Sequence, residues 1–181
     1  MYKIKSSLAA VQTQDRLCES LLKMLKHTPL SAIKISDLCK NADVSRNAFY
    51  RSFETLDDIL VYHVDKICQK MSHYLTDTDS LQSLETYIAG FFRFWYTHKA
   101  DLNLFFFNNR TNLLIGQLSA AIGASLDATS WQLSSDNPIK GYVFLSSGLI
   151  GVLYTWIRQD YSIDPDKLAS WIIENLRRSL P

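Results

Sequence analysis

The fold of this chain is decided by the ten residues Val44-Ser45-Arg46-Asn47-Ala48-Phe49-Tyr50-Arg51-Ser52-Phe53. Ser45 can cap a helix, and Phe49 and Phe53 lie four positions apart, which gives that helix one apolar face. A second short helical pattern, residues 35–42, precedes it and is separated from it by only two residues. Two short helices around a tight turn form a helix-turn-helix, whose second member normally enters the major groove of DNA.

The residues before this motif complete a small helical unit. Apolar residues at helical spacing predict a helix from about Thr13 to Lys26, which ends near Pro29. The three short helices would share a miniature core, expected to consist of Leu17, Leu21, Leu25, Ile33, Leu38, Val44, Phe49 and Phe53. A unit of this size is marginal alone, so it should lean on the part of the chain that follows.

A long helix is predicted directly after this unit. Thr55 is a candidate N-cap, and Asp57 and Asp58 follow in the first turn, where the helix dipole favours acids. Polar residues 76–80 mark the clearest boundary after the helix. The face of the helix that we expect to be buried carries Leu60, Val64, Ile67, Met71 and Leu75.

The predicted fold class is all-α, because six glycines and four prolines leave little material for strands and hairpins. Two domains are expected, residues 1–55 with the helix-turn-helix and residues 56–181 as a helical body, with helix 56–75 as the connector. Apolar spacing predicts the further helices of the body near residues 84–98, 102–109, 113–128 and 141–157, and from residue 164 onward.

Residues 141–157 carry no charge, which would fit either a membrane segment or a helix buried on both sides. The stretch is at the lower edge of the ~17–25 residues that span a membrane and contains hydroxyl residues and glycines, so no membrane segment is expected. A helix that is apolar all round in a soluble protein is instead buried on both sides, which favours a homodimer over a purely intramolecular core. The expected interface residues are Phe144, Gly148, Gly151, Trp156, Trp171 and Leu176.

The distribution of charge separates the two ends of the chain. Residues 1–55 carry nine Lys/Arg and five acids, a net charge of +4, whereas the whole chain has a net charge of +1. A basic front on an acidic body suits a polyanion contact confined to the N-terminal part, although a merely solvated face would carry similar charges.

Motifs of catalysis and metal binding are missing from the sequence. It has no Gly-rich phosphate loop, no Gly-x-Ser-x-Gly and no His-Glu-x-x-His, and its four histidines are scattered, so no cofactor or metal is predicted. Cys18, Cys39 and Cys68 are widely spaced and are expected to be buried, reduced thiols of a cytoplasmic protein. The N-terminus lacks the apolar core of a signal peptide. Binding is therefore the expected role, and a small helical enzyme that uses Cys or His chemistry is the alternative class.

The helix-turn-helix resembles that of the TetR family of transcriptional regulators, and the residues that match its pattern are Leu38, Ala42, Val44, Ser45, Phe49, Tyr50, Phe53, Asp57 and Leu60. More weakly, the C-terminal half is similar to a TetR subgroup that includes regulators of dihydroxyacetone kinase operons, through Phe144, Gly148, Leu149, Gly151, Trp156 and residues 164–166. The resemblance implies a homodimer that binds a palindromic site in double-stranded DNA. It also implies an unidentified small-molecule effector in the C-terminal half.

The resemblance assigns roles along the second helix of the motif. Arg46, Asn47 and Ala48 would lie in its first turn and reach base edges, where arginine favours guanine and asparagine favours adenine. Tyr50 and Arg51 would face the phosphate backbone. The alternatives are a Tyr50 ring packed against the next helix and a free surface arginine at position 46. The complete set of expected DNA-contacting residues is Lys34, Ser45, Arg46, Asn47, Ala48, Tyr50, Arg51 and Thr55.

Three positions depart from the family pattern. Asp43 replaces the turn glycine, which is tolerable because Asp visits the left-handed region more readily than most residues. Lys34 replaces a capping threonine, and Leu56 replaces a lysine beside Glu54, so the phosphate surroundings are less cationic than in the family. The runner-up function is therefore a TetR-like co-regulator that acts mainly through a protein partner.

Aromatic residues are concentrated in the C-terminal half, where TetR-like proteins enclose a small-molecule pocket. Arg93 and Arg110 are the cations available to an acidic ligand. For each ring, ordinary packing in the core or at the dimer interface is the alternative. The expected pocket residues are Phe91, Trp95, Phe105, Tyr142 and Ser146.

Overall fold

The computed structural model describes residues 7–127, 129 and 138–179, with side chains for residues 143–178 of the last range. Within these residues the chain is helical and contains no strand, so the predicted all-α class is confirmed. The helices are α1 (Leu8–Met24), η1 (Leu30–Ala32, a 3₁₀ turn), α2 (Ile35–Asn41), α3 (Arg46–Ser52), α4 (Leu56–Asp77), α5 (Leu84–Thr97), α6 (Lys99–Phe107), α7 (Thr111–Asp127), α8 (Pro138–Arg158) and α9 (Pro165–Ser179).

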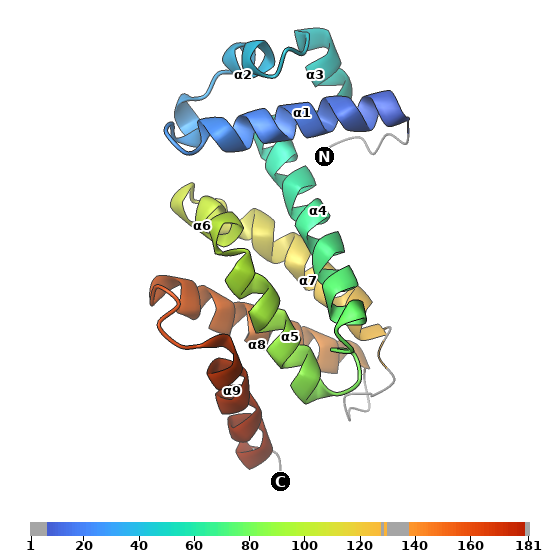
Figure 1. Cartoon of the computed structure of the whole chain (residues 1–181), viewed down its shortest axis with the longest axis vertical. Coiled ribbons are helices and arrows are strands. Elements are labelled where there is room, and N and C mark those ends of the chain that lie inside the picture. The colour runs from blue at the N-terminus through green and yellow to red at the C-terminus, as the bar shows by residue number, and fades with distance from the viewer. Residues whose placement is uncertain (1–6, 128, 130–137, 180–181) are drawn as a thin grey trace.

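The helices form a head and a body that α4 joins (Figure 1). In the head, α2 and α3 lie on one side of α1. Helix α4 leaves the head and runs down into the body, which consists of α5 to α9. Inside the body α7 packs against α4 and α8, and α5 packs along α9. The motif predicted to contact DNA thus lies at one end of the molecule, and α9 lies at the other.

Side-chain caps define where several helices begin. Thr55 accepts a hydrogen bond from the Asp58 amide at 3.2 Å, and the Asp58 carboxylate accepts one from the Thr55 amide at 3.1 Å, so the predicted N-cap of α4 is confirmed. Ser83 and Thr86 form the same reciprocal arrangement at the start of α5. Asp164 caps α9 by accepting from the amides of the next two non-proline residues.

Apolar spacing identified the core of the head and of α4 correctly. Every residue of the predicted α4 face is buried, from Leu60 to Leu75. Of the core residues predicted for the head, only Leu25 and Val44 are partly exposed, and the others are buried. The buried side chains of head and body join into one continuous cluster, so the small head does lean on the body. Among the described helices, none is long and apolar enough to cross a membrane.

Several helix ends differ from the predicted positions by two residues or more, and two of these differences have a clear local cause. Helix α1 begins at Leu8 rather than near Thr13, because Ala9 and Ala10 are strong helix formers that extend it by more than a turn. Helix α4 continues to Asp77, two residues into the polar run, and the Thr76 hydroxyl donates to the Ser72 carbonyl at 3.0 Å. The apolar spacing that predicts this helix ends before the polar run, so it could not show that the helix continues into these residues.

Candidate nucleic-acid interface

The turn between α2 and α3 is closed by backbone hydrogen bonds and by a side chain from α1. The Val44 amide donates to the Cys39 carbonyl at 2.9 Å, and the Asp43 amide donates to the Lys40 carbonyl at 3.2 Å. This pattern needs a left-handed residue after the helix, and Asp43 supplies it with φ of 50°. Arg16 Nη2 donates to the Asp43 carbonyl at 2.8 Å and to its carboxylate at 2.9 Å.

Helix α3 buries one face and presents the other to solvent. The Ser45 hydroxyl caps it by accepting from the Ala48 amide at 3.1 Å. Phe49 is fully buried, and its ring meets the edge of Tyr50 at a centroid distance of 5.1 Å. Tyr50 is 47% exposed, so its ring is available to a ligand outside the head. Arg46 and Asn47 are exposed on the first turn, as the prediction placed them.

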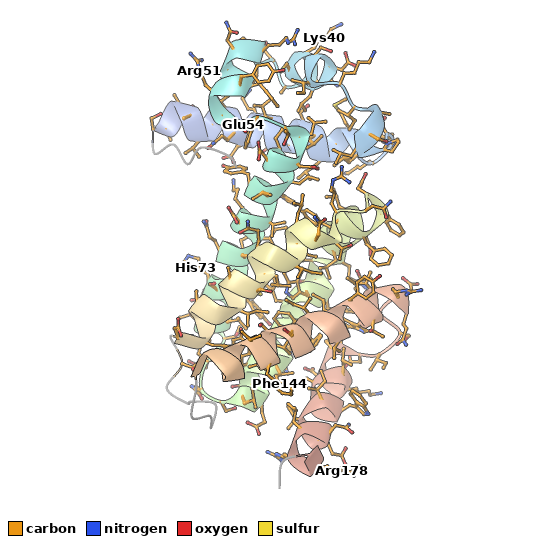
Figure 2. All side chains as sticks on the ribbon, turned by 180° about the vertical axis from the view of Figure 1, so that it is seen from behind. Lys40, Arg51, Glu54, His73, Phe144 and Arg178 are labelled. Carbon is orange, nitrogen blue, oxygen red and sulfur yellow. The ribbon has the colours of Figure 1, made fainter. Side chains whose placement is uncertain are left out.

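The exposed cations of α2 and α3 form no ion pair within the described part of the chain. Lys40, Arg46 and Arg51 have no carboxylate partner among the residues that the structure describes, and neither has Lys34. Many cations elsewhere do pair, and Arg93 with Asp166 at 2.5 Å is one example. Figure 2 shows Lys40 and Arg51 at the outer end of the head, with Glu54 nearer the start of α4. An unpaired cationic surface of this kind suits a polyanion.

The positive end of the α4 helix dipole is compensated by the Asp58 carboxylate of its own capping box. The Asp58 carboxylate accepts from the Glu54 amide at 2.9 Å as well as from Thr55. Burial acts to raise the pKa of Asp58, but hydrogen bonds to its carboxylate, among which the one from the Glu54 amide has the largest effect, help to hold that pKa below its ordinary value. The Thr55 hydroxyl oxygen accepts a hydrogen bond within the cap, and its O–H group remains able to donate one to a phosphate. Lys34 precedes α2 without a side-chain cap, as expected.

Polar contacts fix the head on the body. Asp15 of α1 accepts from the Tyr62 hydroxyl at 2.7 Å and from the Lys66 ammonium at 2.5 Å, both on α4. On the other side, the Leu30 amide of the head donates to the Asn108 side chain of the α6–α7 turn at 3.2 Å. The orientation of α3 relative to the body therefore depends on both α4 and the end of α6.

The residues predicted for a ligand pocket lie in the core of the body. Phe91, Trp95 and Phe105 are fully buried, and the Trp95 indole Nε1 has no hydrogen-bond partner in the described structure. Ser146 is buried and its hydroxyl donates to the Val143 carbonyl at 3.2 Å. The side chain of Tyr142 lies outside the described residues.

The two arginines suggested for an acidic ligand are engaged in ion pairs between helices. Arg110 pairs with Asp57 of α4 at 2.7 Å, and Arg93 of α5 pairs with Asp166 of α9. Both arginines therefore hold helices of this chain together, which leaves their guanidinium groups less available to a small molecule.

The cysteines are free and buried, as predicted. Burial raises the pKa of Cys18 and of Cys68 to about 12, and it also raises the pKa of Cys39. These thiols are protonated at neutral pH and are poor nucleophiles. In the portion of the chain that is described, no three His, Cys, Asp or Glu side chains come together as a metal site.

The residues predicted for a dimer interface surround hollows between α8 and α9. Phe144 is 69% exposed and Trp171 is 58% exposed, while Gly148 and Gly151 face open space. One hollow of about 500 Å³ reaches from Gly148 to Trp171, and a second of about 280 Å³ extends from there to Leu176. Trp156 differs from the others because it is buried in its own chain, where its indole donates to the Ile163 carbonyl at 2.9 Å.

Solved structures of low sequence identity share this fold. Lin0861 from Listeria innocua is 20% identical with a TM-score of 0.75, over 97% of this chain and 94% of that chain. The TetR family repressor AlkX from Dietzia sp. strain DQ12-45-1b, implicated in biodegradation of n-alkanes, is 17% identical with a TM-score of 0.60, over 96% and 95%. A transcriptional regulator of the TetR/AcrR family from Aquifex aeolicus VF5 is 16% identical with a TM-score of 0.56, over 91% and 98%.

These likenesses confirm the prediction of a TetR-type fold, and at such identities they establish the fold alone. Comparison of the sequence with protein-family models and with curated proteins gives no match. The similarity to the subgroup of dihydroxyacetone kinase regulators stays a prediction.

Sequence reasoning missed three residues that shape the candidate site. Lys40 could have been found, because it is a polar residue in the last turn of a predicted helix beside the turn. Arg16 and Asn108 could not, because their partners Asp43 and Leu30 lie 27 and 78 residues away along the chain.

Proposed function

We propose that this chain is a TetR-like transcriptional regulator that binds a palindromic site in double-stranded DNA as a homodimer. The observation that carries the proposal is that α3 has one face buried in the core and one face exposed to solvent. Phe49 and its neighbours anchor the helix in the core, while Arg46, Asn47 and Arg51 face outward with no ion pair among the described residues, and Tyr50 is 47% exposed beside them. A helix held in this way can enter a major groove and present these side chains to bases and phosphates.

Different side chains on this surface would supply affinity and specificity. Arg46 and Asn47 carry the donors that match guanine and adenine edges, so they would read sequence. Lys34, Lys40 and Arg51 would contact phosphates, which gives affinity that falls with salt. Ser45 and Ala48 lie at the first turn of α3 and would contact the DNA where that turn approaches it closely. Thr55 would donate a hydrogen bond from its hydroxyl to a phosphate.

Fluorescence anisotropy with DNA from upstream of the gene tests the proposal. Binding should be tighter than to random duplex, and the half-sites should lie about one helical turn apart. Arg46→Ala should cost about 1–3 kcal/mol on the preferred site. Arg158→Ala is the matched control, because Arg158 is an exposed arginine at the far end of α8 that also lacks an ion pair in the described structure. Equal binding of specific and random duplex would refute the proposal.

We further propose that a small molecule in the core of the body regulates DNA binding. The buried indole N–H of Trp95 supports this, because leaving such a donor unpaired costs about 1–3 kcal/mol that a bound acceptor would recover. Phe91 and Phe105 would supply apolar surface around the same occupant. Native mass spectrometry of the protein purified from its own host would detect a molecule retained there.

A co-regulator that works through a protein partner is the competing function, and Glu54 is the observation that favours it. This carboxylate is exposed beside the start of α4, where a DNA phosphate would be repelled. Under this alternative, Arg46→Ala would leave regulation unchanged and a specific partner would bind this end of the head.

A further inference from the structure

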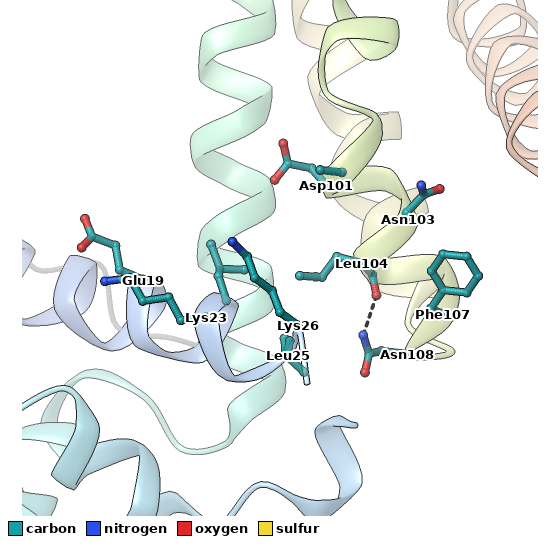
Figure 3. Close-up of a pocket in the computed structure, with 11 residues that line it drawn as sticks. Glu19, Lys23, Leu25, Lys26, Asp101, Asn103, Leu104, Phe107 and Asn108 are labelled. Carbon is teal, nitrogen blue, oxygen red and sulfur yellow. Dashed lines mark hydrogen bonds between the residues drawn. The ribbon is translucent and has the colours of Figure 1, made fainter. Parts of the chain in front are cut away.

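A cleft of about 530 Å³ lies between the end of α1 and helix α6, where the head faces the body (Figure 3). The head contributes the wall that contains Leu22, Leu25 and Lys26, and α6 contributes the wall that contains Leu104 and Phe107. The cleft is separate from the α3 surface and from the hollows between α8 and α9.

The walls of this cleft offer apolar surface from both sides. Leu22, Leu25 and Leu104 are partly buried leucines that pack on the core. Phe107 is 77% exposed, although the two phenylalanines before it are buried or partly buried. A large exposed ring beside leucines gains stability when an apolar molecule covers it.

The charges of the cleft favour an anion on the head side. Lys23 and Lys26 have no carboxylate partner in the described structure, and Glu19 on the same wall leaves it with one net positive charge. Asp101 on the opposite wall is already engaged, because its carboxylate lies 2.8 Å from Nε2 of His63. Figure 3 shows the Lys26 side chain extending along the cleft between Leu25 and Asp101.

The cleft adjoins the hydrogen bond that ties its two walls together. The Asn108 side chain lines the cleft, accepts from the Leu30 amide of the head at 3.2 Å, and donates to the Leu104 carbonyl of α6 at 2.8 Å. An occupant that touches Lys26 and Phe107 would therefore bridge head and body beside an existing link.

We propose that this cleft binds a small organic anion with an apolar body, of the class of medium-chain carboxylates. The carboxylate lies against Lys23 and Lys26, and the apolar chain covers Phe107 and Leu104. Occupancy restrains the head on the body and so changes the DNA affinity of the dimer, a consequence that rests on the proposed function.

Titration of the full chain with octanoate, followed in ¹H–¹⁵N spectra, tests the site. Saturable shifts are expected at the side-chain amides of Asn103 and Asn108. Phe107→Ala should weaken binding about tenfold, the scale of partial burial of one aromatic side chain. Lys26→Glu should also weaken binding, and octan-1-ol should bind less well than octanoate. Both side chains are exposed, so both variants should keep the native spectrum.

Ile163→Ala is the control for binding at the hollow of about 500 Å³ between α8 and α9, because the exposed Ile163 side chain lines that hollow. Its octanoate affinity should equal that of the unaltered protein. Absence of saturable shifts, or shifts that survive both Phe107→Ala and Lys26→Glu, would overturn the cleft site.

Anisotropy with DNA at saturating octanoate tests the coupling separately. The dissociation constant for the preferred DNA should change in the unaltered protein and stay constant in Phe107→Ala. An unchanged constant despite octanoate binding would overturn the coupling. Octanoate binding in a protein that prefers no DNA would leave the cleft site standing and refute the proposed function instead.

Discussion

Arg16 on α1 holds Asp43 in the turn of the helix-turn-helix, with bonds of 2.8 Å to its carbonyl and 2.9 Å to its carboxylate. Asp43 has φ of 50°, a conformation that glycine would adopt without a side-chain penalty. Asp43 therefore introduces some backbone strain, but its carboxylate accepts the hydrogen bond by which Arg16 links α1 to the turn. Because the turn sets the angle between α2 and α3, this contact also steadies the proposed recognition helix.

Arg16→Ala should lower the free energy of unfolding by about 1 kcal/mol, the scale of one charged hydrogen bond at a half-exposed site. It should also weaken DNA binding, because α3 would be held less firmly. Urea unfolding and anisotropy would measure the two effects. Arg178→Ala, which breaks the ion pair with Glu174 at the far end of the molecule, should change neither by a comparable amount. A variant at position 16 with unaltered stability and binding would show that the backbone alone holds the turn.

This turn illustrates which features could be predicted from the sequence. The cap at Ser45, the buried ring of Phe49 and the cap at Thr55 depend on neighbours within a few residues, so local spacing was enough. The contact of Arg16 with Asp43 depends on how α1 crosses α2 and α3, which no local pattern encodes. For the same reason, the lack of charge in residues 141–157 predicted burial but could not say which face of α8 its own chain leaves uncovered.

Asp58 should make the stability of the protein depend on pH at the acidic end. Its pKa in the folded chain is held below the ordinary value of 3.8, so its stabilising effect is complete above that pH and is lost as pH falls through the lowered pKa. Asp58→Asn should destabilise the protein by about 1 kcal/mol at pH 7 through the weakened cap of α4. The difference from the unaltered chain should shrink below pH 3.8. Thermal unfolding at several pH values would measure it, with the exposed Asp127→Asn as the control. A difference that stays constant with pH would contradict the assignment.

Trp95 and Trp156 should respond differently to loss of the indole N–H. Both are buried, but Trp156 donates to the Ile163 carbonyl at 2.9 Å, whereas Trp95 Nε1 has no partner in the described structure. Replacement by phenylalanine leaves a similar cavity in each case. Trp156→Phe should therefore destabilise the ligand-free protein by about 1 kcal/mol more than Trp95→Phe does, because only the first removes an indole hydrogen bond. Equal losses in urea unfolding would indicate that Trp95 also has a partner in solution.

Gly148 offers a direct test of the proposed dimer. A Cβ atom added at Gly148 or at Gly116 on α7 would meet nothing within 4 Å beyond its neighbours on the helix backbone, so a side chain at either position starts in open space. Replacing glycine inside a helix should even stabilise the isolated chain by a fraction of ~1 kcal/mol. If α8 and α9 of two chains pack together around Phe144 and Trp171, Gly148→Trp should block their approach and yield monomers by sedimentation. Gly116→Trp should stay dimeric. A Gly148→Trp protein that sediments as a dimer would place the interface elsewhere. A folded monomer that has also lost DNA binding would show that the two half-sites are bound by the two subunits of one symmetric dimer.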